Sequence, residues 1–315
     1  MDYYIYIEFY TLLFNLIYQK IMAIKKPLDY KNFSQKHNLD SSNFLTLSSA
    51  KIIKNTSISE APTAVLYMYN DFQACPFADT CRDVCLIQSG RAIFSPKIME
   101  CRIRRHKAFI YDRAMFFRFC VSEVIRHYSK HRTYDQIGFR FNGTSDWHIL
   151  RMPIKIEQVD SDYLLKAFNV YIEPIKYNSI IECLMHAFDT KLNQSVGYKL
   201  HMYDYTKRPI TSSDLKLAKK LGYHLSLSHG SKADLFSKAL ELGLNYAASF
   251  KLRHNEPLPK TFTYKGVTLE VLDGDLTDWR IDDPSDKTRI IGLKHKRTKN
   301  QTDEAINKFC INTCV

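Results

Sequence analysis

The sequence lacks the short motifs that mark the commonest nucleotide-binding and hydrolytic enzymes. It contains no GxGxxG, P-loop, HExxH or GxSxG pattern. Its eight cysteines in 315 residues are too few for a disulfide-stapled scaffold. The composition is also not that of collagen, a coiled coil or a disordered chain. These absences leave a globular protein that is long enough for one large domain or two ordinary ones.

A long uninterrupted hydrophobic run is also missing. The first 26 residues, MDYYIYIEFYTLLFNLIYQKIMAIKK, are rich in apolar side chains, but Glu8 and Asn15 interrupt them and no basic segment precedes them as in a signal peptide. A charge inside the run opposes membrane insertion. We expect an upstream extension or a surface helix in residues 1–21 rather than a membrane anchor. The polar residues 22–62 predict an irregular lead-in, so that residues 1–62 form an N-terminal extension.

From residue 63 onward, short apolar runs alternate with helical stretches. Strand starts recur at intervals of twenty-odd residues in the second half, which is typical of β-loop-α units and a parallel sheet. We therefore expect an α/β fold of mostly parallel β/α repeats, as a partial or complete barrel. Residues 63–299 would form one domain and residues 300–315 a tail. The predicted strands are 63–69, 136–142, 196–205, 222–228, 244–251, 267–273 and 289–295, and the predicted helices are 96–131, 178–192, 211–221 and 231–243.

Polar clusters follow five of the predicted strands. In parallel β/α folds, functional sites lie at the carboxyl ends of the strands. Each loop alone could be an ordinary turn, because Asn, Asp, Gly and Ser favour turns, but five at corresponding positions predict one functional edge. The catalytic residues predicted there are Asp146, Tyr205, Lys207 and His229, and the cofactor-binding residues are Asn142, Gly143, Ser228, Asp273, Asp275 and Asp278.

Three cysteines occupy the loop after the first predicted strand. Cys75, Cys81 and Cys85 have the spacing C-x5-C-x3-C. A thiolate triplet in one loop can bind three irons of a cubane cluster and leave the fourth iron open. Zinc is an alternative that requires a fourth ligand, such as Cys101 or His106. Three reduced thiols without a metal are the third possibility.

A positive charge excess points toward polyanionic partners. Lys and Arg outnumber Asp and Glu by 45 to 33, which gives a net charge of +12. Residues 96–132 form the most basic segment, and its predicted helix has an apolar stripe of Phe109, Phe116, Cys120, Val124 and Tyr128. The charges fit either a phosphate-binding surface or an ordinary solvated helix face. Nucleic acid is therefore a predicted partner through residues 96–132.

Several strand-end segments resemble the bacteriophage gene product 88 family. They are, in order, CPFADTCRDVCL, RFNGTSDWH, YDYTKR, YHLSLSHGS, VLDGDLTDWRIDDP and IIGLKHK, and the resemblance extends over roughly residues 63–297. It implies a phage origin and a place in the cytoplasm of an infected host cell. The family's characteristic positions map onto the cysteine triplet and onto Asn142, Gly143, Asp146, Tyr205, Lys207, Asp273, Asp275 and Asp278.

Two function hypotheses follow from these observations. The cysteine loop resembles that of radical S-adenosylmethionine enzymes in its place after the first strand, although those enzymes show C-x3-C-x2-C. The first hypothesis is therefore an iron–sulfur enzyme that uses S-adenosylmethionine on a nucleotide or nucleic acid. The second is a non-catalytic nucleic-acid-binding phage protein with a structural zinc.

Overall fold

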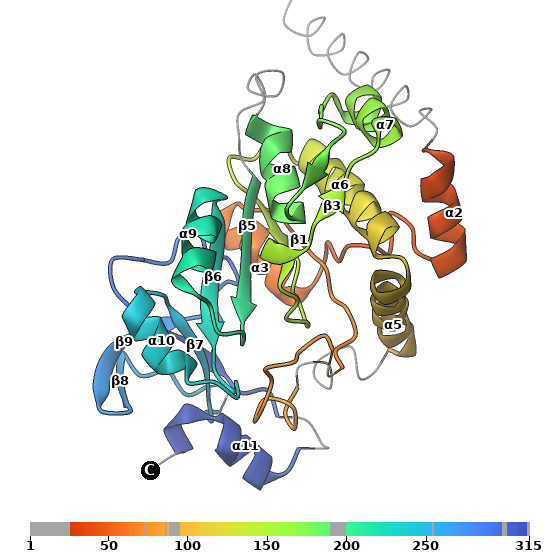
Figure 1. Cartoon of the computed structure of the whole chain (residues 1–315). Coiled ribbons are helices and arrows are strands. Elements are labelled where there is room, and N and C mark those ends of the chain that lie inside the picture. The colour runs from red at the N-terminus through yellow and green to blue at the C-terminus, as the bar shows by residue number, and fades with distance from the viewer. Residues whose placement is uncertain are drawn as a thin grey trace, which may run out of the picture.

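A mostly parallel eight-stranded sheet forms the centre of the protein (Figure 1). The computed structural model describes residues 26–71, 73–85, 87, 95–189, 200–253, 255–297 and 301–313. The strand order is β1-β2-β5-β6-β7-β10-β9-β8, and only the β8–β9 pair is antiparallel. The predicted α/β class with a mostly parallel sheet is therefore confirmed. The strands of this sheet are β1 (Thr63–Val65), β2 (Ile137–Arg140), β5 (Leu200–Thr206), β6 (Tyr223–Ser228), β7 (Tyr246–Phe250), β8 (Thr261–Tyr264), β9 (Val267–Asp273) and β10 (Ile290–Lys294).

All seven predicted strands overlap strands of this sheet, and β8 is the one that the sequence pattern missed. β8 and β9 form a hairpin whose two turn residues, Lys265 and Gly266, have φ angles of 49° and 78°. Two successive positive φ angles are typical of a type I′ turn, which matches the twist of the joined strands. The predicted strand 196–205 begins in residues that lie outside the described part of the chain.

The sheet has two edges in the described residues. β1 lies at one end of the strand order and β8 at the other, and no described pairing joins them. β1 also makes a short antiparallel bridge through Val65 to Thr46. A closed barrel is therefore not seen among the described residues. Whether the sheet is a partial barrel stays a prediction.

Most helices of the described chain lie on one face of the sheet. From β1 to β7, each new strand is added on the same side of the previous one, and right-handed crossovers then place the connecting helices on one face (Figure 1). α3 covers the opposite face at β1. The helices are α2 (Leu28–His37), α3 (Ala50–Ser59), α5 (Pro96–Tyr111), α6 (Arg113–Lys130), α7 (Gln158–Phe168), α8 (Ile180–Asp189), α9 (Ser212–Lys220), α10 (Leu235–Leu242) and α11 (Asp303–Phe309), with 3-10 turns η2 (Ile149–Arg151) and η4 (Ile311–Thr313) and a small hairpin of β3 (Ile154–Lys155) and β4 (Lys176–Tyr177).

The single long helix predicted over residues 96–131 is wrong in one respect, because two helices occupy this segment. The backbone leaves the helical region at Asp112, with φ −146° and ψ 45°, and the carboxylate of Asp112 accepts a hydrogen bond from Lys36 of α2. The predicted apolar stripe is nevertheless buried throughout. A break of one residue leaves the helical spacing of that stripe almost unchanged, which is why periodicity did not reveal it.

The prediction of an irregular lead-in for residues 22–62 is wrong over its described part. α2 and α3 form there, and the few apolar side chains of the segment, Tyr30, Phe33 and Phe44 among them, pack in the main core. Lys26 also forms an ion pair with Glu123 of α6 at 2.9 Å. Residues 26–62 therefore contribute to the core of the sheet protein. The hydrophobic segment 1–21 lies outside the described residues.

The two faces of the sheet differ in chemistry. Ile137, Phe139 and Met202 point into the main apolar core beneath the helices. Since side chains alternate along a strand, Gly138, Arg140 and the other intervening residues point to the opposite face, which we call the α3 face. The segment 274–289 between β9 and β10 lies over the α3 face, where Trp279 stacks edge-on against Tyr203.

Replacing Phe44 should test whether the lead-in belongs to the folding unit. We expect Phe44→Ala to lower the free energy of unfolding by about 3–5 kcal/mol, because the ring is fully buried against Phe116 and Phe119. Ile58→Ala on α3 is the control, since Ile58 is 58% exposed and should cost about 0.5 kcal/mol or less. Urea unfolding measures both, and equal small losses would contradict a core role for residues 26–62.

Candidate functional site

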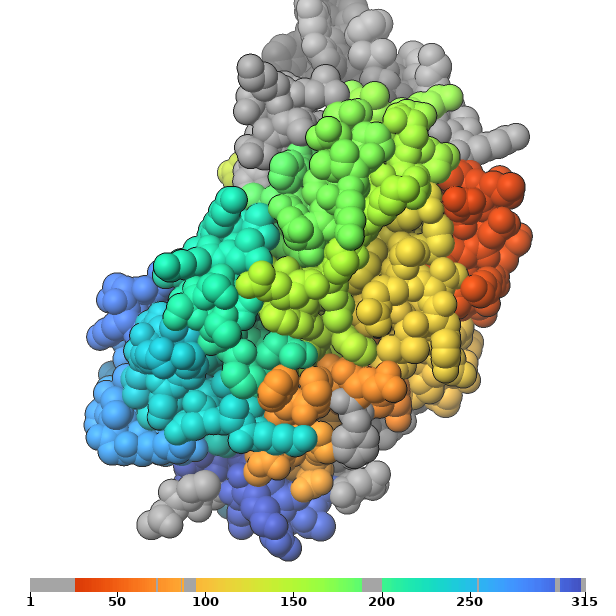
Figure 2. Space-filling view, in the orientation of Figure 1, coloured from red at the N-terminus to blue at the C-terminus, as the bar shows by residue number. Residues whose placement is uncertain are grey.

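Loops from four neighbouring strands meet at the carboxyl edge of the sheet. The loops after β1 and β2 are joined by a hydrogen bond from the Asp146 amide to the Ala74 carbonyl. The loops after β5 and β6 are joined by a hydrogen bond from the Ser231 hydroxyl to the Lys207 carbonyl. In Figure 2 the loop after β1, drawn in orange, lies on the surface beside the teal and cyan segments that follow β5 and β6. The predicted shared edge therefore exists for these four loops.

The cysteine-bearing segment 71–85, which we call the thiol loop, docks on the chain that follows β6. Ala78 and Ser231 form an antiparallel bridge, the Asp79 amide donates to the Gly230 carbonyl, and the Lys232 amide donates to the Phe77 carbonyl. These backbone contacts hold the loop across the end of the sheet.

Gly230 allows this close approach. Its φ angle is 84°, and an added Cβ would lie 2.9 Å from Cβ of Cys81 and 2.9 Å from the ring of Phe309. Both the left-handed backbone and the crowding favour glycine.

The last described helix covers the thiol loop. Val84 of the loop lies in a small apolar cluster with Ala305, Ile306 and Cys310, against which Phe309 packs. The predicted tail thus folds as α11 on the site, below the thiol loop in Figure 1. Cys314 lies outside the described residues.

The three thiols are free, half-buried and arranged around Lys207. The ammonium of Lys207 interacts electrostatically with all three sulfurs and with Asp146. Burial is the main cause that raises the pKa of Cys75 to about 12, and the Asp146 charge adds to it. Burial likewise raises the pKa of Cys81. Without a metal these two thiols are protonated at neutral pH, so that they are poor nucleophiles.

Asp146 and Lys207 form the polar centre of the edge. Oδ1 of Asp146 accepts a hydrogen bond from the Thr206 hydroxyl at 2.6 Å, and Oδ2 accepts one from the Lys207 amide at 3.0 Å. Burial raises the pKa of Asp146, although Thr206 and Lys207 act in the opposite direction. Burial acts to lower the pKa of Lys207, but the charges of Cys81 and Asp146 raise it above its usual value. Lys207 is therefore a half-buried cation that interacts with the thiols.

Asn142 and Gly143 shape the loop that presents Asp146. Oδ1 of Asn142 accepts from the Ser145 hydroxyl and from the Trp147 amide, and Nδ2 donates to the Trp147 carbonyl. A Cβ at Gly143 would lie 2.7 Å from the Tyr67 ring, so only glycine fits there without movement. Both residues have a structural role at this edge.

Ser228 and His229 lie next to Lys207. The Lys207 ammonium donates to the Ser228 hydroxyl at 3.2 Å, and Nδ1 of His229 lies 2.8 Å from the Tyr246 hydroxyl. Burial, assisted by the positive charge of Lys207, lowers the pKa of His229 to about 4. The imidazole is therefore neutral at pH 7, and its hydrogen bonds go to the Tyr246 hydroxyl and the Phe309 backbone.

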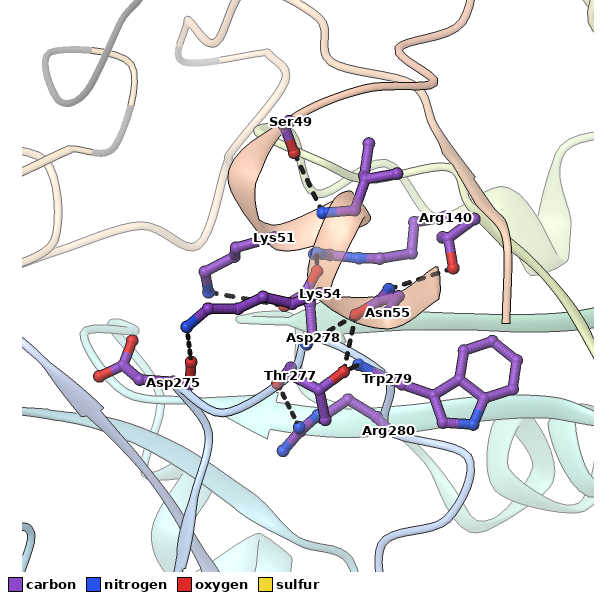
Figure 3. A network of polar contacts seen from close by, with 12 residues as sticks. Ser49, Lys51, Lys54, Asn55, Arg140, Asp275, Thr277, Asp278, Trp279 and Arg280 are labelled. Carbon is purple, nitrogen blue, oxygen red and sulfur yellow. Dashed lines mark hydrogen bonds and ion pairs between the residues drawn. The ribbon is translucent and has the colours of Figure 1, made fainter. Parts of the chain in front are cut away.

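The three predicted acids after β9 do not meet at one point. Oδ1 of Asp273 accepts from the Asp275 amide, and Oδ2 of Asp275 accepts from the Lys294 amide, so both carboxylates support local turns. Asp278 is buried on the α3 face and pairs with Arg140, with Lys51 at 3.6 Å (Figure 3). Tyr205 also faces this side, under the guanidinium of Arg140 at 5.0 Å.

The sequence reasoning missed several buried polar residues on the strands themselves. Asp204 accepts hydrogen bonds from two backbone amides and from the Tyr223 hydroxyl, and burial raises its pKa to about 7. Arg140 on β2 and Ser226 on β6 are also buried, as is Arg280 in the segment 274–289. On β6 the available signal was the alternation of His224, Ser226 and Ser228 with apolar residues, because a strand buried on both faces is otherwise expected to be apolar throughout.

Among the described residues, no three His, Cys, Asp or Glu side chains lie close enough together to hold a single metal ion. Nor does any described helix have the length and apolar character to cross a membrane.

The fold and the edge together define a mostly parallel α/β protein with a three-thiol loop at the carboxyl ends of its strands. Residues 33–157 match the model of the family described as Gene product 88. The match covers less than half of the chain and includes the thiol loop and the Asn142–Asp146 loop, so it supports the resemblance to this family over those residues. No curated protein and no solved structure matches the chain. Similarity to radical S-adenosylmethionine enzymes is not shown by these comparisons.

The fit of the thiol loop against the chain after β6 can be tested at Gly230. Gly230→Ala and Gly243→Ala both place a side chain at a positive φ, but only the first meets Cys81, since nothing lies within 4 Å of a Cβ at Gly243. We expect Gly230→Ala to cost about 1–3 kcal/mol more in urea unfolding. Maleimide labelling of Cys81, followed by peptide mass spectrometry, should also be faster. Equal losses and equal labelling rates would contradict the docking.

Proposed function

We propose that Cys75, Cys81 and Cys85 hold an iron–sulfur cluster and that the protein is an enzyme of the radical S-adenosylmethionine type, acting on a nucleotide or nucleic acid. The observation that carries this proposal is the position of three thiols in one loop at the carboxyl edge of a parallel sheet, where the half-buried Lys207 interacts with all three. Because the resemblance is to a phage family, the proposal includes action in the cytoplasm of an infected cell.

Three thiols in one loop match the ligand number of a cubane cluster, whereas one zinc ion would need a fourth ligand. Three thiolates of a cubane bind three different irons and therefore stand further apart than the ligands of one zinc ion. The fourth iron would accept the amino and carboxylate groups of S-adenosylmethionine.

The charges around the loop fit an anionic cluster. Lys207 interacts with all three sulfurs, and the guanidinium of Arg102 interacts with Cys85. These two cations would offset thiolate charge in a partly buried site. When bound, the cluster would supply one electron for reductive cleavage of S-adenosylmethionine into methionine and a 5′-deoxyadenosyl radical.

The polar residues of the edge would position the substrate and the cofactor. Lys207 and Ser228 lie on the strand side of the thiols, with Asp146 fixing the Lys207 backbone. We assign a catalytic role to Asp146, Lys207, His229 and Tyr205 and a cofactor-binding role to Ser228, Asn142 and Gly143. Asp273 and Asp275 would lie farther along the same edge, at the end of β9, and Asp278 on the α3 face.

α5 suggests a phosphate-bearing substrate. Its backbone carbonyl at Arg102 accepts a hydrogen bond from the Tyr69 amide, and His106 pairs with Asp71, so the helix flanks the thiol loop. Of the basic residues in 96–132, Arg105 and Arg118 are buried in structural contacts, whereas Lys97 and Lys107 are exposed. The exposed lysines of α5 are therefore the proposed contacts to a nucleic-acid backbone.

Iron reconstitution tests the cluster. The full chain, purified without oxygen and incubated with iron and sulfide, should retain about four irons and four sulfides. With dithionite it should form 5′-deoxyadenosine from S-adenosylmethionine. Replacing the three loop cysteines by serine should abolish both, whereas Cys101→Ser should retain both, because the Cys101 thiol donates to the Asn43 carbonyl outside the loop.

Iron content that is equal in the wild type and the triple variant would rule out the cluster. Binding of about one zinc per chain, lost in the triple variant, would instead support the alternative of a non-catalytic nucleic-acid-binding protein with a structural zinc.

Salt-dependent binding tests the nucleic-acid substrate. The logarithm of the association constant for an oligonucleotide should fall linearly with the logarithm of salt concentration. Lys97→Gln with Lys107→Gln should reduce the slope by about 0.7–0.9 per lysine. Lys130→Gln with Arg132→Gln removes the same charge at the exposed carboxyl end of α6 and serves as the control. Equal slopes in both double variants would mean that α5 does not contact the phosphates.

A further inference from the structure

Several buried polar atoms on the α3 face have no hydrogen-bond partner within the described residues, and four of them belong to β5, β6 and Arg280. They are the Tyr205 hydroxyl, Nε2 of His224, Oγ of Ser226 and Nε of Arg280. Native proteins seldom leave such groups unpaired, since a buried donor without an acceptor is destabilising. A cluster of them therefore points to a molecule that completes their hydrogen bonds.

These four groups are neighbours. Tyr205 lies opposite Ser226 in the parallel pairing of β5 and β6, and Tyr203 lies opposite His224. Residues opposite each other, and residues two apart on one strand, point to the same face. Arg280, from the segment over this face, interacts electrostatically with both Tyr205 and His224. The four groups thus come together on the α3 face from two strands and one loop.

Two of the four residues are fully buried and two are partly exposed. Ser226 is 0% and Arg280 2% exposed, so neither can turn to solvent. The other two guanidinium nitrogens of Arg280 are used, one donating to Asp283 and one to the Thr277 carbonyl, which fixes the group in place (Figure 3). Tyr205 and His224 are half-buried, so part of each side chain reaches solvent.

The hydrogen-bonding capacity of these four groups indicates which kind of ligand they would bind. Nε of Arg280 can only donate, and the hydroxyls of Tyr205 and Ser226 donate readily, as does the imidazole in one tautomer. A fixed guanidinium with neighbouring hydroxyl donors is complementary to an oxygen-rich anion. Ser228 follows Ser226 by two residues and accepts from the Lys207 ammonium, so a second cation lies farther along the same face.

We propose that the α3 face binds an oxyanion, a phosphate or a carboxylate group, between Arg280 and the strand residues Tyr205, His224 and Ser226. Such a group would belong to a ligand that extends along β5 and β6 toward Lys207. The proposal is independent of metal binding at the thiols.

Thermal unfolding of the full chain in inorganic phosphate tests the site. Phosphate should raise the unfolding temperature in a saturable manner relative to sodium chloride at equal ionic strength, because a ligand that binds only the folded state stabilises it. An acetate arm distinguishes the two anions: stabilisation by acetate alone identifies a carboxylate site, and by phosphate alone a phosphate site.

Two conservative variants locate the binding. Ser226→Ala and Tyr205→Phe each remove a hydroxyl without a described partner, so both should fold with unchanged or higher stability in the absence of ligand. Each should weaken anion binding about tenfold. Ser122→Ala, a buried serine of α6 beneath the other face of the sheet, should leave binding unchanged. The proposal is overturned if neither anion stabilises the protein beyond chloride, or if both variants bind as tightly as the wild type.

Discussion

The carboxylate of Asp146 is the contact on which the arrangement of the carboxyl edge depends. Its two oxygens accept from the Thr206 hydroxyl and the Lys207 amide, and its own amide donates to the carbonyl of Ala74 in the thiol loop. One buried residue thus fixes the ends of β1, β2 and β5 relative to one another. Burying a carboxylate is costly unless hydrogen bonds compensate, and here both oxygens are occupied. The position of the thiols beside Lys207 follows from this arrangement.

Much of the fold could be predicted from the sequence because its strands are short, β-branched or aromatic and regularly spaced. α2 and α3 could not, because their segment has few apolar residues, and these are buried only when α2 packs against α6 and α3 against β1. The ion pair of Arg140 with Asp278 could not be predicted from the sequence either. It joins residues far apart in the chain and depends on the path of the segment 274–289 across the sheet. The site residues nearest the thiols were predictable, since they directly follow strands.

The two faces of the sheet contribute differently, one through apolar packing and the other through buried polar contacts. One face packs phenylalanines and aliphatic residues under the helices, where burial supplies most of the folding free energy. The other face carries arginines, tyrosines, histidine and serines. Asn55 of α3 accepts a hydrogen bond from the Asp278 amide on this face (Figure 3). It also donates one to the Tyr203 hydroxyl. A buried polar face is stable only when its polar groups have hydrogen-bond or ion-pair partners. The positions of its side chains are therefore more tightly constrained than those in the apolar core.

The cover that α11 forms over the thiol loop has a consequence for the order of events during synthesis. Residues 71–85 leave the ribosome long before residues 303–309, which supply the apolar side chains against Val84. Until α11 has been synthesised, Val84 of the thiol loop lacks its apolar partners. A cofactor that binds this loop can therefore arrive before α11 packs against it.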